Sequence, residues 1–331
     1  MERALRLTQL LSVQNLKVSL TNPENGQRGW VLRGIDLSLE KGERLALVGE
    51  SGCGKSMTAL SILHLLPRPP MEMEEGTIRF QGQDLGLLKE SEWRKIRGPQ
   101  MGVIFQEPVS SLNPVISIGD QMGEVLRVHA NLSEMEIQQK VADLLKEVGL
   151  PDPGRIMRQY PHQLSGGMCQ RVMIAMAVAC EPALLIADEP TTALDVTVQA
   201  QILDLLFRMT EQHQLSVLFI THNLKIVRGY ADRVAILYLG LVVEEGAPNE
   251  IFDHPQHPYT EGLLASLPEV FNKSKELFSI GGRVPTPYEA LQGCAFANRC
   301  PRVDKRCREE APTLNELMKG HQVRCFYPSK R

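Results

Sequence analysis

The sequence has no apolar run long enough to cross a membrane. Its longest such run, Val172 to Cys180, is less than half of the roughly 20 residues that a membrane-spanning helix needs. Residues 1–16 lack the apolar centre and the small-residue cleavage site of a secretory signal. We therefore expect a cytosolic chain whose contact with any membrane is made through a partner.

The chain also has little net charge and no sign of an oxidised scaffold. Its formal net charge is −3 at pH 7 without long blocks of one sign, so the basic face that nucleic-acid binding requires is missing. The seven cysteines include no C-x-x-C pair, and in a cytosolic chain they do not indicate disulfides. With 43% hydrophobic residues among 331, the composition predicts a globular chain of one large or two smaller domains.

The strongest motif is Gly49 to Ser56, GESGCGKS, which fits the phosphate-binding pattern G-x-x-x-x-G-K-[ST]. It follows the apolar run Leu45 to Val48 and precedes the helix-like stretch Met57 to Leu66, the strand–loop–helix context that the motif requires. Its glycines allow backbone N–H groups to turn inward as a nest for an anion. We assign nucleotide contacts to Gly49, Ser51, Gly52, Cys53, Gly54, Lys55, Ser56 and Met57.

Within this loop, Lys55 is expected to reach the terminal phosphates, and the Ser56 hydroxyl is expected to hold Mg²⁺. A second apolar run, Leu184 to Ala187, ends in Asp188 and Glu189. Open α/β sheets bind ligands at the carboxyl ends of their strands, so these carboxylates belong to the same kind of site. Asp188 would hold Mg²⁺ through water, and Glu189 would orient and deprotonate the attacking water.

Alternating strand and helix patterns predict a mostly parallel α/β sheet. Residues 11–48 read as strands around a polar turn at 21–29, and a helical section is inserted at about 107–180. Ser133 and Glu136 form a capping box at the start of one predicted helix. Trp30 is a candidate to stack on an adenine ring, although a core or edge-strand position explains it equally well.

Further motifs, spread over residues 10–250, resemble the ATPase subunits of ABC transporters. They are Gln106, Leu164-Ser165-Gly166-Gly167, Asp188-Glu189-Pro190, Ala193-Leu194-Asp195 and His222, in the family's order and spacing. Three details are similar to the oligopeptide/dipeptide/nickel permease subgroup: Phe105-Gln106-Glu107-Pro108 followed by Ser111-Leu112-Asn113-Pro114, His257-Pro258-Tyr259-Thr260, and a cysteine-bearing tail that begins Gly293-Cys294-Ala295-Phe296.

The resemblance implies an α/β P-loop ABC ATPase with a RecA-like core, an antiparallel β subdomain, the inserted helical subdomain and a small cysteine-bearing C-terminal region. It places a nucleotide-binding domain at 1–250 and a C-terminal domain at 251–331. It implies that Ser165-Gly166-Gly167 faces the γ-phosphate bound by an opposite subunit, and that Asp195 bridges the two subunits. Gln106 would sense Mg²⁺ and the water, and His222 would contact the γ-phosphate.

The last four cysteines, Cys294, Cys300, Cys307 and Cys325, supply four thiolates, which suit zinc or an iron–sulfur cluster equally well by number. Because the paired spacing of structural zinc sites is absent, the pattern favours a 4Fe–4S cluster, and the resemblance points the same way. Zinc and unliganded core cysteines are the alternatives.

The resemblance implies an ATP- and Mg²⁺-dependent ATPase that powers peptide import. Its partners would be a second ATPase subunit in a heterodimer, two transmembrane permease subunits and an extracytoplasmic substrate-binding protein. It would lie at the cytoplasmic face of the inner membrane. An ATPase for nickel or another small solute is the alternative. A non-transport ABC ATPase of DNA repair is disfavoured because 56–164 leaves no room for long coiled coils.

Overall fold

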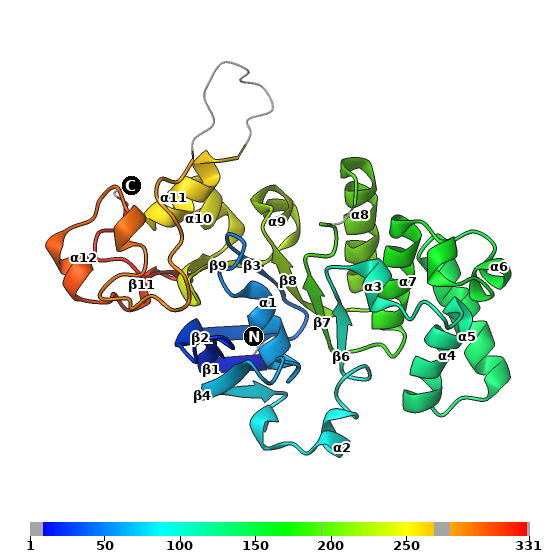
Figure 1. Cartoon of the computed structure of the whole chain (residues 1–331). Helices are drawn as coiled ribbons and strands as arrows, with labels where there is room; N and C mark the ends of the chain where they lie inside the picture. Colours follow the sequence, from blue (N-terminus) through cyan, green and yellow to red (C-terminus); the bar gives the residue numbers. More distant parts are fainter. Residues whose placement is uncertain (1–8, 193, 268–278, 330–331) are drawn as a thin grey trace, which may run out of the picture. The chain divides into compact units, whose positions relative to one another are not determined.

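The computed structural model of the chain describes residues 9–192, 194–267 and 279–329 (Figure 1). The chain divides into two compact units, which are described separately. Of the described residues, those in 40–43 and 87–219 form the first unit, and those in 9–39, 44–86 and 220–329 form the second. Ala193, which belongs to one of the motifs above, lies outside the described residues.

The second unit contains a four-stranded sheet in the order β2 (Arg28–Glu40), β1 (Gln9–Thr21), β4 (Met71–Phe80) and β5 (Gln83–Asp84). β1 and β4 are antiparallel, with a bulge between Gln14 and Val18. The alternating apolar residues of β1 and β2 lie on the buried face, as their period of two predicts. The predicted strands on either side of the polar turn at 21–29 are therefore confirmed.

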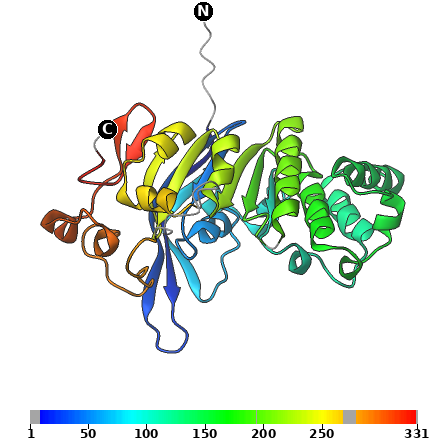
Figure 2. The same cartoon turned by 90° about the horizontal axis from the view of Figure 1, so that it is seen from above.

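The same unit also contains five strands of a larger sheet. Their order is β11 (Asn315–Met318), β12 (His321–Val323), β10 (Leu241–Gly246), β9 (Arg233–Tyr238) and β3 (Arg44–Val48). β3 and β9 are parallel, whereas β9, β10, β12 and β11 pair antiparallel. Figure 2 shows the β11–β12 hairpin, in red, beside the yellow segment that contains β10.

Short helices complete this unit: α1 (Lys55–Ile62), α9 (Leu224–Tyr230), α10 (Pro248–Asp253), α11 (Pro258–Ala265), η3 (Ala297–Arg299) and α12 (Lys305–Glu309). One hydrophobic cluster joins the C-terminal region to the sheet. It contains Val48 of β3, Ile236 and Tyr238 of β9, Tyr259 of α11, and Phe296. The cysteine-bearing region therefore shares its core with the strand that precedes the phosphate-binding loop.

The first unit contains the parallel strands β6 (Met101–Ile104) and β7 (Leu184–Asp188), and β8 (Ser216–Thr221) is the neighbour of β7. Its helices are α2 (Glu90–Trp93), α3 (Pro108–Ser111), α4 (Ile118–His129), α5 (Glu134–Glu147), α6 (Pro153–Met157), α7 (Gly166–Val178) and α8 (Val196–Gln212), and η2 (Pro161–Gln163) is a 3-10 turn. A further 3-10 turn, η1 (Leu85–Leu87), lies at the boundary between the second unit and the first. Figure 1 shows α4 to α7 grouped together, in green. The helices within 107–180 match the helical section predicted there.

Local sequence signals explain several helix boundaries. Ser133 accepts a hydrogen bond from the Glu136 N–H, and the Glu136 carboxylate accepts one from the Ser133 N–H, so the predicted capping box is confirmed. Ser117 caps α4 in the same way through the N–H of Asp120. Each cap satisfies an amide that the first turn of a helix would otherwise leave unpaired.

β4 begins at Met71 because antiparallel pairing with β1 extends it beyond the bulge. The helix predicted over Met57 to Leu66 differs at both ends, because α1 begins at Lys55 and ends at Ile62. The β11–β12 hairpin was not predicted at all. Within the described residues, no helix is long and apolar enough to cross a membrane.

Candidate functional site

The phosphate-binding loop connects β3 to α1 in the second unit. Gly52 and Gly54 have φ angles of 79° and 109°, a region that favours glycine, as the motif predicts. Gly54 is the N-cap of α1 and provides no side-chain cap, and Ser56 and Met57 lie in the first turn. Uncapped amides at a helix N-terminus are suited to bind an anion.

Lys55 is 4% exposed, and its side chain lies against the phosphate-binding loop. Its Nζ atom donates hydrogen bonds to the carbonyl oxygens of Gly49, at 2.9 Å, and of Glu50, at 3.1 Å. A Cβ atom on Gly49 would lie 2.3 Å from the carbonyl oxygen of Leu237, so only glycine fits at the start of the loop. The carbonyls of the loop therefore hold the ammonium group of Lys55 in this structure. Ser51 is exposed at the surface of the loop.

Cys53 is a buried residue of this loop. Its side chain is 2% exposed, and burial raises the pKa of its thiol to about 11. The backbone carbonyl of Cys53 accepts a hydrogen bond from the N–H of Gly240 at 2.8 Å. The thiol is therefore neutral and covered near neutral pH, and the nucleotide contact assigned to Cys53 stays a prediction.

In the first unit, the two carboxylates at the end of β7 have different surroundings. Asp188 is the last residue of the strand and is 9% exposed. Glu189 has a φ of 46°, and its Oε2 atom accepts hydrogen bonds from the Thr192 hydroxyl, at 2.9 Å, and from Nε2 of Gln106, at 3.4 Å. The structure therefore brings Gln106 and Glu189 together. Thr192 was not predicted, because one threonine after a loop proline carries no distinctive signal.

The Ser165-Gly166-Gly167 motif begins α7, also in the first unit. The Ser165 hydroxyl caps this helix by accepting a hydrogen bond from the N–H of Met168 at 3.3 Å. A Cβ atom on Gly167 would lie 3.0 Å from Val198 on α8. Asp195 caps α8 through the N–H of Val198, at 3.0 Å, so its role within the chain is to start a helix. Its predicted role between subunits stays a prediction.

Trp30 and His222 belong to the second unit. Trp30 lies on β2 and is half-buried. Its backbone N–H donates a hydrogen bond to the carbonyl of Pro287, and the guanidinium carbon of Arg28 lies 5.9 Å from its ring centroid. The strand passes close to the phosphate-binding loop, since a Cβ on Gly54 would lie 2.7 Å from Leu32. Trp30 is therefore near enough to the loop to stay a candidate for adenine stacking. His222 is exposed and directly follows β8.

Cys294, Cys300, Cys307 and Cys325 line one small cavity in the second unit, of about 10 Å³, together with His257 and Phe296. Burial raises the pKa of the Cys325 thiol to about 11 and also raises the pKa values of Cys294 and Cys300. The fold thus brings the four cysteines to the lining of one cavity. The cavity has room for about one water molecule only, and the described residues contain no group of three or more side chains arranged to hold a metal ion. The cluster prediction is therefore not confirmed.

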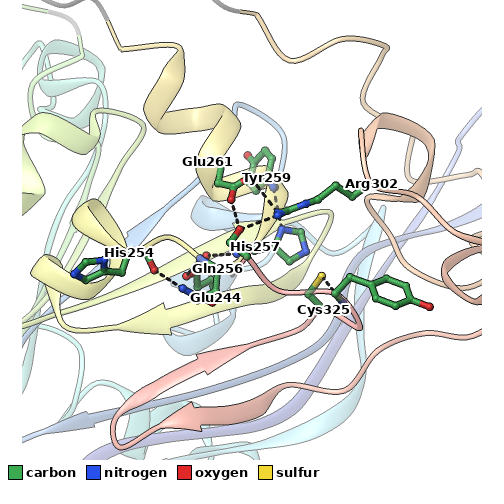
Figure 3. A network of polar contacts seen from close by, with 10 residues as sticks. Glu244, His254, Gln256, His257, Tyr259, Glu261, Arg302 and Cys325 are labelled. Atoms are coloured by element: carbon green, nitrogen blue, oxygen red, sulfur yellow. Dashed lines mark hydrogen bonds and ion pairs between the residues drawn. The ribbon is translucent and has the colours of Figure 1, made fainter. Parts of the chain in front are cut away.

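A polar network lies beside this cavity (Figure 3). Glu244 on β10 is fully buried and accepts hydrogen bonds from the N–H groups of Gln256 and His257. Arg302 pairs with Glu261 on α11 at 3.0 Å. Burial, with Arg302 and Arg324 nearby, lowers the pKa of His257 to about 3, so its imidazole is neutral near neutral pH. This network fastens the segment before α11 to the sheet.

Two protein families match the sequence in separate regions. The family described as "ABC transporter" matches residues 32–192, and the "Oligopeptide/dipeptide transporter, C-terminal region" matches residues 243–307. Among solved structures, the fold is similar to that of MJ0796, a dimeric ATP-binding cassette bound to ADP and phosphate. The TM-score is 0.64 at 28% identity, over 72% of this chain and 99% of that chain. The fold and the phosphate-binding loop thus define an ABC-type ATP-binding subunit.

Similar proteins indicate which kind of ABC-type ATP-binding subunit this chain is. The chain is 46% identical to the dipeptide transport ATP-binding protein DppD of Bacillus subtilis, over 98% of this chain and 96% of that protein. It is 45% identical to DppD of Escherichia coli, over 96% of this chain and 97% of that protein. The chain therefore belongs to the ATP-binding subunits of oligopeptide/dipeptide-type ABC transporters, which are ATPases coupled to transport.

Proposed function

We propose that this chain binds MgATP on the Gly49–Ser56 loop and that its hydrolysis of ATP powers import of peptides through a membrane permease. The main support is the loop itself, whose two left-handed glycines and uncapped helix start form an anion nest. Lys55 moves from the carbonyls of Gly49 and Glu50 to the terminal phosphates when nucleotide binds. The ammonium group then neutralises part of the triphosphate charge.

Five side chains are proposed to serve hydrolysis. Ser56, Gln106 and Asp188 supply the oxygen ligands that Mg²⁺ prefers, and the ion would neutralise charge on the phosphates. Glu189 accepts the proton of the attacking water, and its hydrogen bonds to Gln106 and Thr192 fix the direction of its carboxylate. His222 contacts the γ-phosphate. These roles are assigned from the motifs, and the contact between Gln106 and Glu189 supports them.

The proposed assembly has four kinds of component. A second ATPase subunit forms a heterodimer with this chain, and the helix start at Ser165-Gly166-Gly167 faces the nucleotide held by that subunit. Asp195 lies at this dimer interface. Two permease subunits hold the pair at the cytoplasmic face of the plasma membrane, and an extracytoplasmic protein delivers the substrate. The names of the similar proteins, dipeptide and oligopeptide transport subunits, support the peptide substrate.

Uptake of labelled dipeptide tests the proposed function directly. Cells whose own copy is replaced by the Glu189→Gln variant are expected to lose uptake, because the ATPase that powers it is inactive. The unchanged chain is expected to restore it. Normal dipeptide uptake in the variant cells would overturn the peptide assignment, and measurement of nickel uptake in the same cells would then test the alternative small-solute function.

Replacing Trp30 with Ala tests adenine stacking. Stacking of a base on an aromatic ring contributes about 1–3 kcal/mol, so we expect ATP affinity to fall by about tenfold to a hundredfold. Trp30→Phe, which keeps an aromatic face, is the matched control and should retain most of the affinity. Titration with a fluorescent ATP analogue measures both. If the ATP affinity of Trp30→Ala is unchanged, Trp30 does not stack on adenine and is a structural residue of β2 instead.

We further propose that Cys294, Cys300, Cys307 and Cys325 hold a 4Fe–4S cluster with a structural role. The donor set supports this, because the four cysteines line one cavity and four thiolates are a ligand set that iron–sulfur clusters use. The cavity between the four cysteines, about 10 Å³, is smaller than a cluster, so their side chains would have to move apart to hold one. Zinc bound by the same thiols is the second candidate.

Metal analysis of protein purified without oxygen decides between these possibilities. A cluster predicts about four iron atoms and four acid-labile sulfides per chain, and zinc predicts about one zinc atom. Cys300→Ser is expected to lose the metal, whereas Cys180→Ser, which changes a cysteine outside the cavity, is expected to keep it. Folded protein that contains neither metal would make these residues unliganded core cysteines.

A further inference from the structure

A side chain from the C-terminal region forms an ion pair with the phosphate-binding loop. The guanidinium of Arg299 donates two hydrogen bonds to the carboxylate of Glu50, from Nη1 to Oε2 at 2.7 Å and from Nη2 to Oε1 at 3.1 Å. The Arg299 side chain is 5% exposed, and that of Glu50 is 29% exposed. These hydrogen bonds raise the pKa of Arg299 above its usual value. Two-point contacts of this kind fix orientation as well as charge.

The backbone of Glu50 is held from the same direction. Its N–H donates a hydrogen bond to the hydroxyl of Tyr259 at 3.0 Å, and Tyr259 is fully buried on α11. The carbonyl of Glu50 is one of the two that Lys55 contacts. Glu50 therefore connects the lysine of the loop to two residues more than 200 positions away in the sequence.

Arg299 is itself fixed on several sides. Its Nε atom donates to the carbonyl of Gly281 at 3.1 Å, and Nη2 donates weakly to that of Ile280 at 3.4 Å. The guanidinium carbon lies 5.8 Å from the ring centroid of Tyr238 and 6.0 Å from that of Phe296. A cation held between carbonyls and aromatic rings loses little further freedom when it binds a carboxylate.

The turn that carries Arg299 is bounded by two of the cavity cysteines. Arg299 ends the 3-10 turn η3, Cys300 is its C-cap, and the Cys294 carbonyl accepts a hydrogen bond from the N–H of Ala297 at 3.0 Å. The N–H of Cys294 in turn donates to the carbonyl of Cys307 at 2.7 Å. The position of the guanidinium therefore depends on the fold of the thiol-lined region.

We propose that Arg299 is a positioning residue of the nucleotide site, which acts through Glu50 to fix the backbone of the loop and to neutralise a carboxylate that would otherwise repel the triphosphate. The proposal rests on the proposed binding of phosphate by Gly49–Ser56. A carboxylate is an unfavourable neighbour for a triphosphate, because like charges at short range raise the free energy of binding. Arg299 removes this cost while the loop keeps the geometry that Glu50 supports.

A charge-paired set of variants tests the proposal on the purified full chain. Arg299→Gln leaves the Glu50 carboxylate unpaired, so we expect ATP affinity to fall by about tenfold, and ADP affinity by less because ADP carries less charge. The double variant Glu50→Gln with Arg299→Gln removes both charges and is expected to recover most of this loss. Arg299→Lys keeps the charge but not the two-point contact, so it is expected to lie between the unchanged chain and Arg299→Gln. A merely structural role would leave the double variant no better than Arg299→Gln.

Two controls separate this proposal from the one on which it rests. Arg283→Gln breaks an exposed two-point pair with Glu289 in the same region and is expected to leave ATP affinity unchanged. Lys55→Ala tests the loop itself. If Lys55→Ala binds ATP normally, the proposed phosphate site is wrong. If Lys55→Ala loses binding but Arg299→Gln does not, only the role of Arg299 is overturned.

Hydrogen exchange gives a second measurement that does not depend on affinity. Because coupling between two sites is reciprocal, ATP binding is expected to slow exchange at residues 294–300 in the unchanged chain. The double variant, which lacks both charges, is expected to lose this protection while it still binds ATP. Equal protection in both proteins would overturn the link between the loop and the C-terminal region.

Discussion

Replacing Glu189 with Gln is expected to lower ATP turnover by about 10²- to 10⁴-fold while ATP binding is retained. The amide cannot accept the proton of the attacking water, but it still fits beside the Thr192 hydroxyl, which lies 2.9 Å from the present carboxylate. Phosphate release measures turnover, and titration with a fluorescent ATP analogue measures binding. If ATP holds the two subunits of the proposed dimer together, the variant, which keeps ATP, should also accumulate as a dimer.

The matched control for this variant is Glu124→Gln, which removes an exposed carboxylate from α4. It is expected to hydrolyse ATP at the normal rate. Gln106→Ala removes the second hydrogen bond to Glu189 and is expected to give a smaller loss than Glu189→Gln. Normal turnover in Glu189→Gln would mean that another group activates the water, and the assignment of Glu189 would be wrong.

Local signals predicted the parts of the site that a short stretch of chain builds by itself. The glycines at 52 and 54 predicted the left-handed backbone of the phosphate loop, which the φ angles confirm. The apolar run before Asp188 predicted a buried strand that ends at this carboxylate, and β7 confirms it. In both cases the backbone conformation is set by residues a few positions away, so the sequence is sufficient.

Contacts over long sequence distances could not be predicted. Glu50 and Arg299 are separated by 249 positions, and neither has a neighbour in sequence that indicates the other. The sequence does not predict the β11–β12 hairpin, because most β11 residues are exposed and the apolar alternation that indicates a strand is weak. The number of cysteines suggested a shared site, but only the fold shows that all four thiols line one cavity.

These long-range contacts give the C-terminal region a definite place in the second unit. It shares a hydrophobic core with β3 and β9, holds Glu50 of the phosphate loop through Arg299 and Tyr259, and extends the sheet through β12. The region is thus attached to the same strand and loop that bind nucleotide in our proposal. Its loss would be expected to disturb the loop as well as the tail.

Replacing the buried Glu244 with Ala is expected to destabilise this attachment by about 3 kcal/mol or more. The carboxylate is fully buried and accepts three hydrogen bonds, from the N–H of Gln256 at 2.7 Å, the N–H of His257 at 2.9 Å, and Nε2 of His321 at 2.8 Å (Figure 3 shows the first two residues). Alanine leaves these donors unpaired in the core and opens a cavity beside them. Each consequence by itself lowers stability.

Because the chain has two compact units, a local probe is more informative than a single unfolding midpoint. Hydrogen exchange is therefore expected to accelerate in Glu244→Ala at 256–257 and in the hairpin at 315–323, which contacts β10 through His321 and Val323. Glu309→Ala, which removes an exposed carboxylate from α12, is the control and is expected to change neither segment. If exchange at 315–323 stays slow in Glu244→Ala, strand pairing between β10 and β12 holds the hairpin without the buried carboxylate.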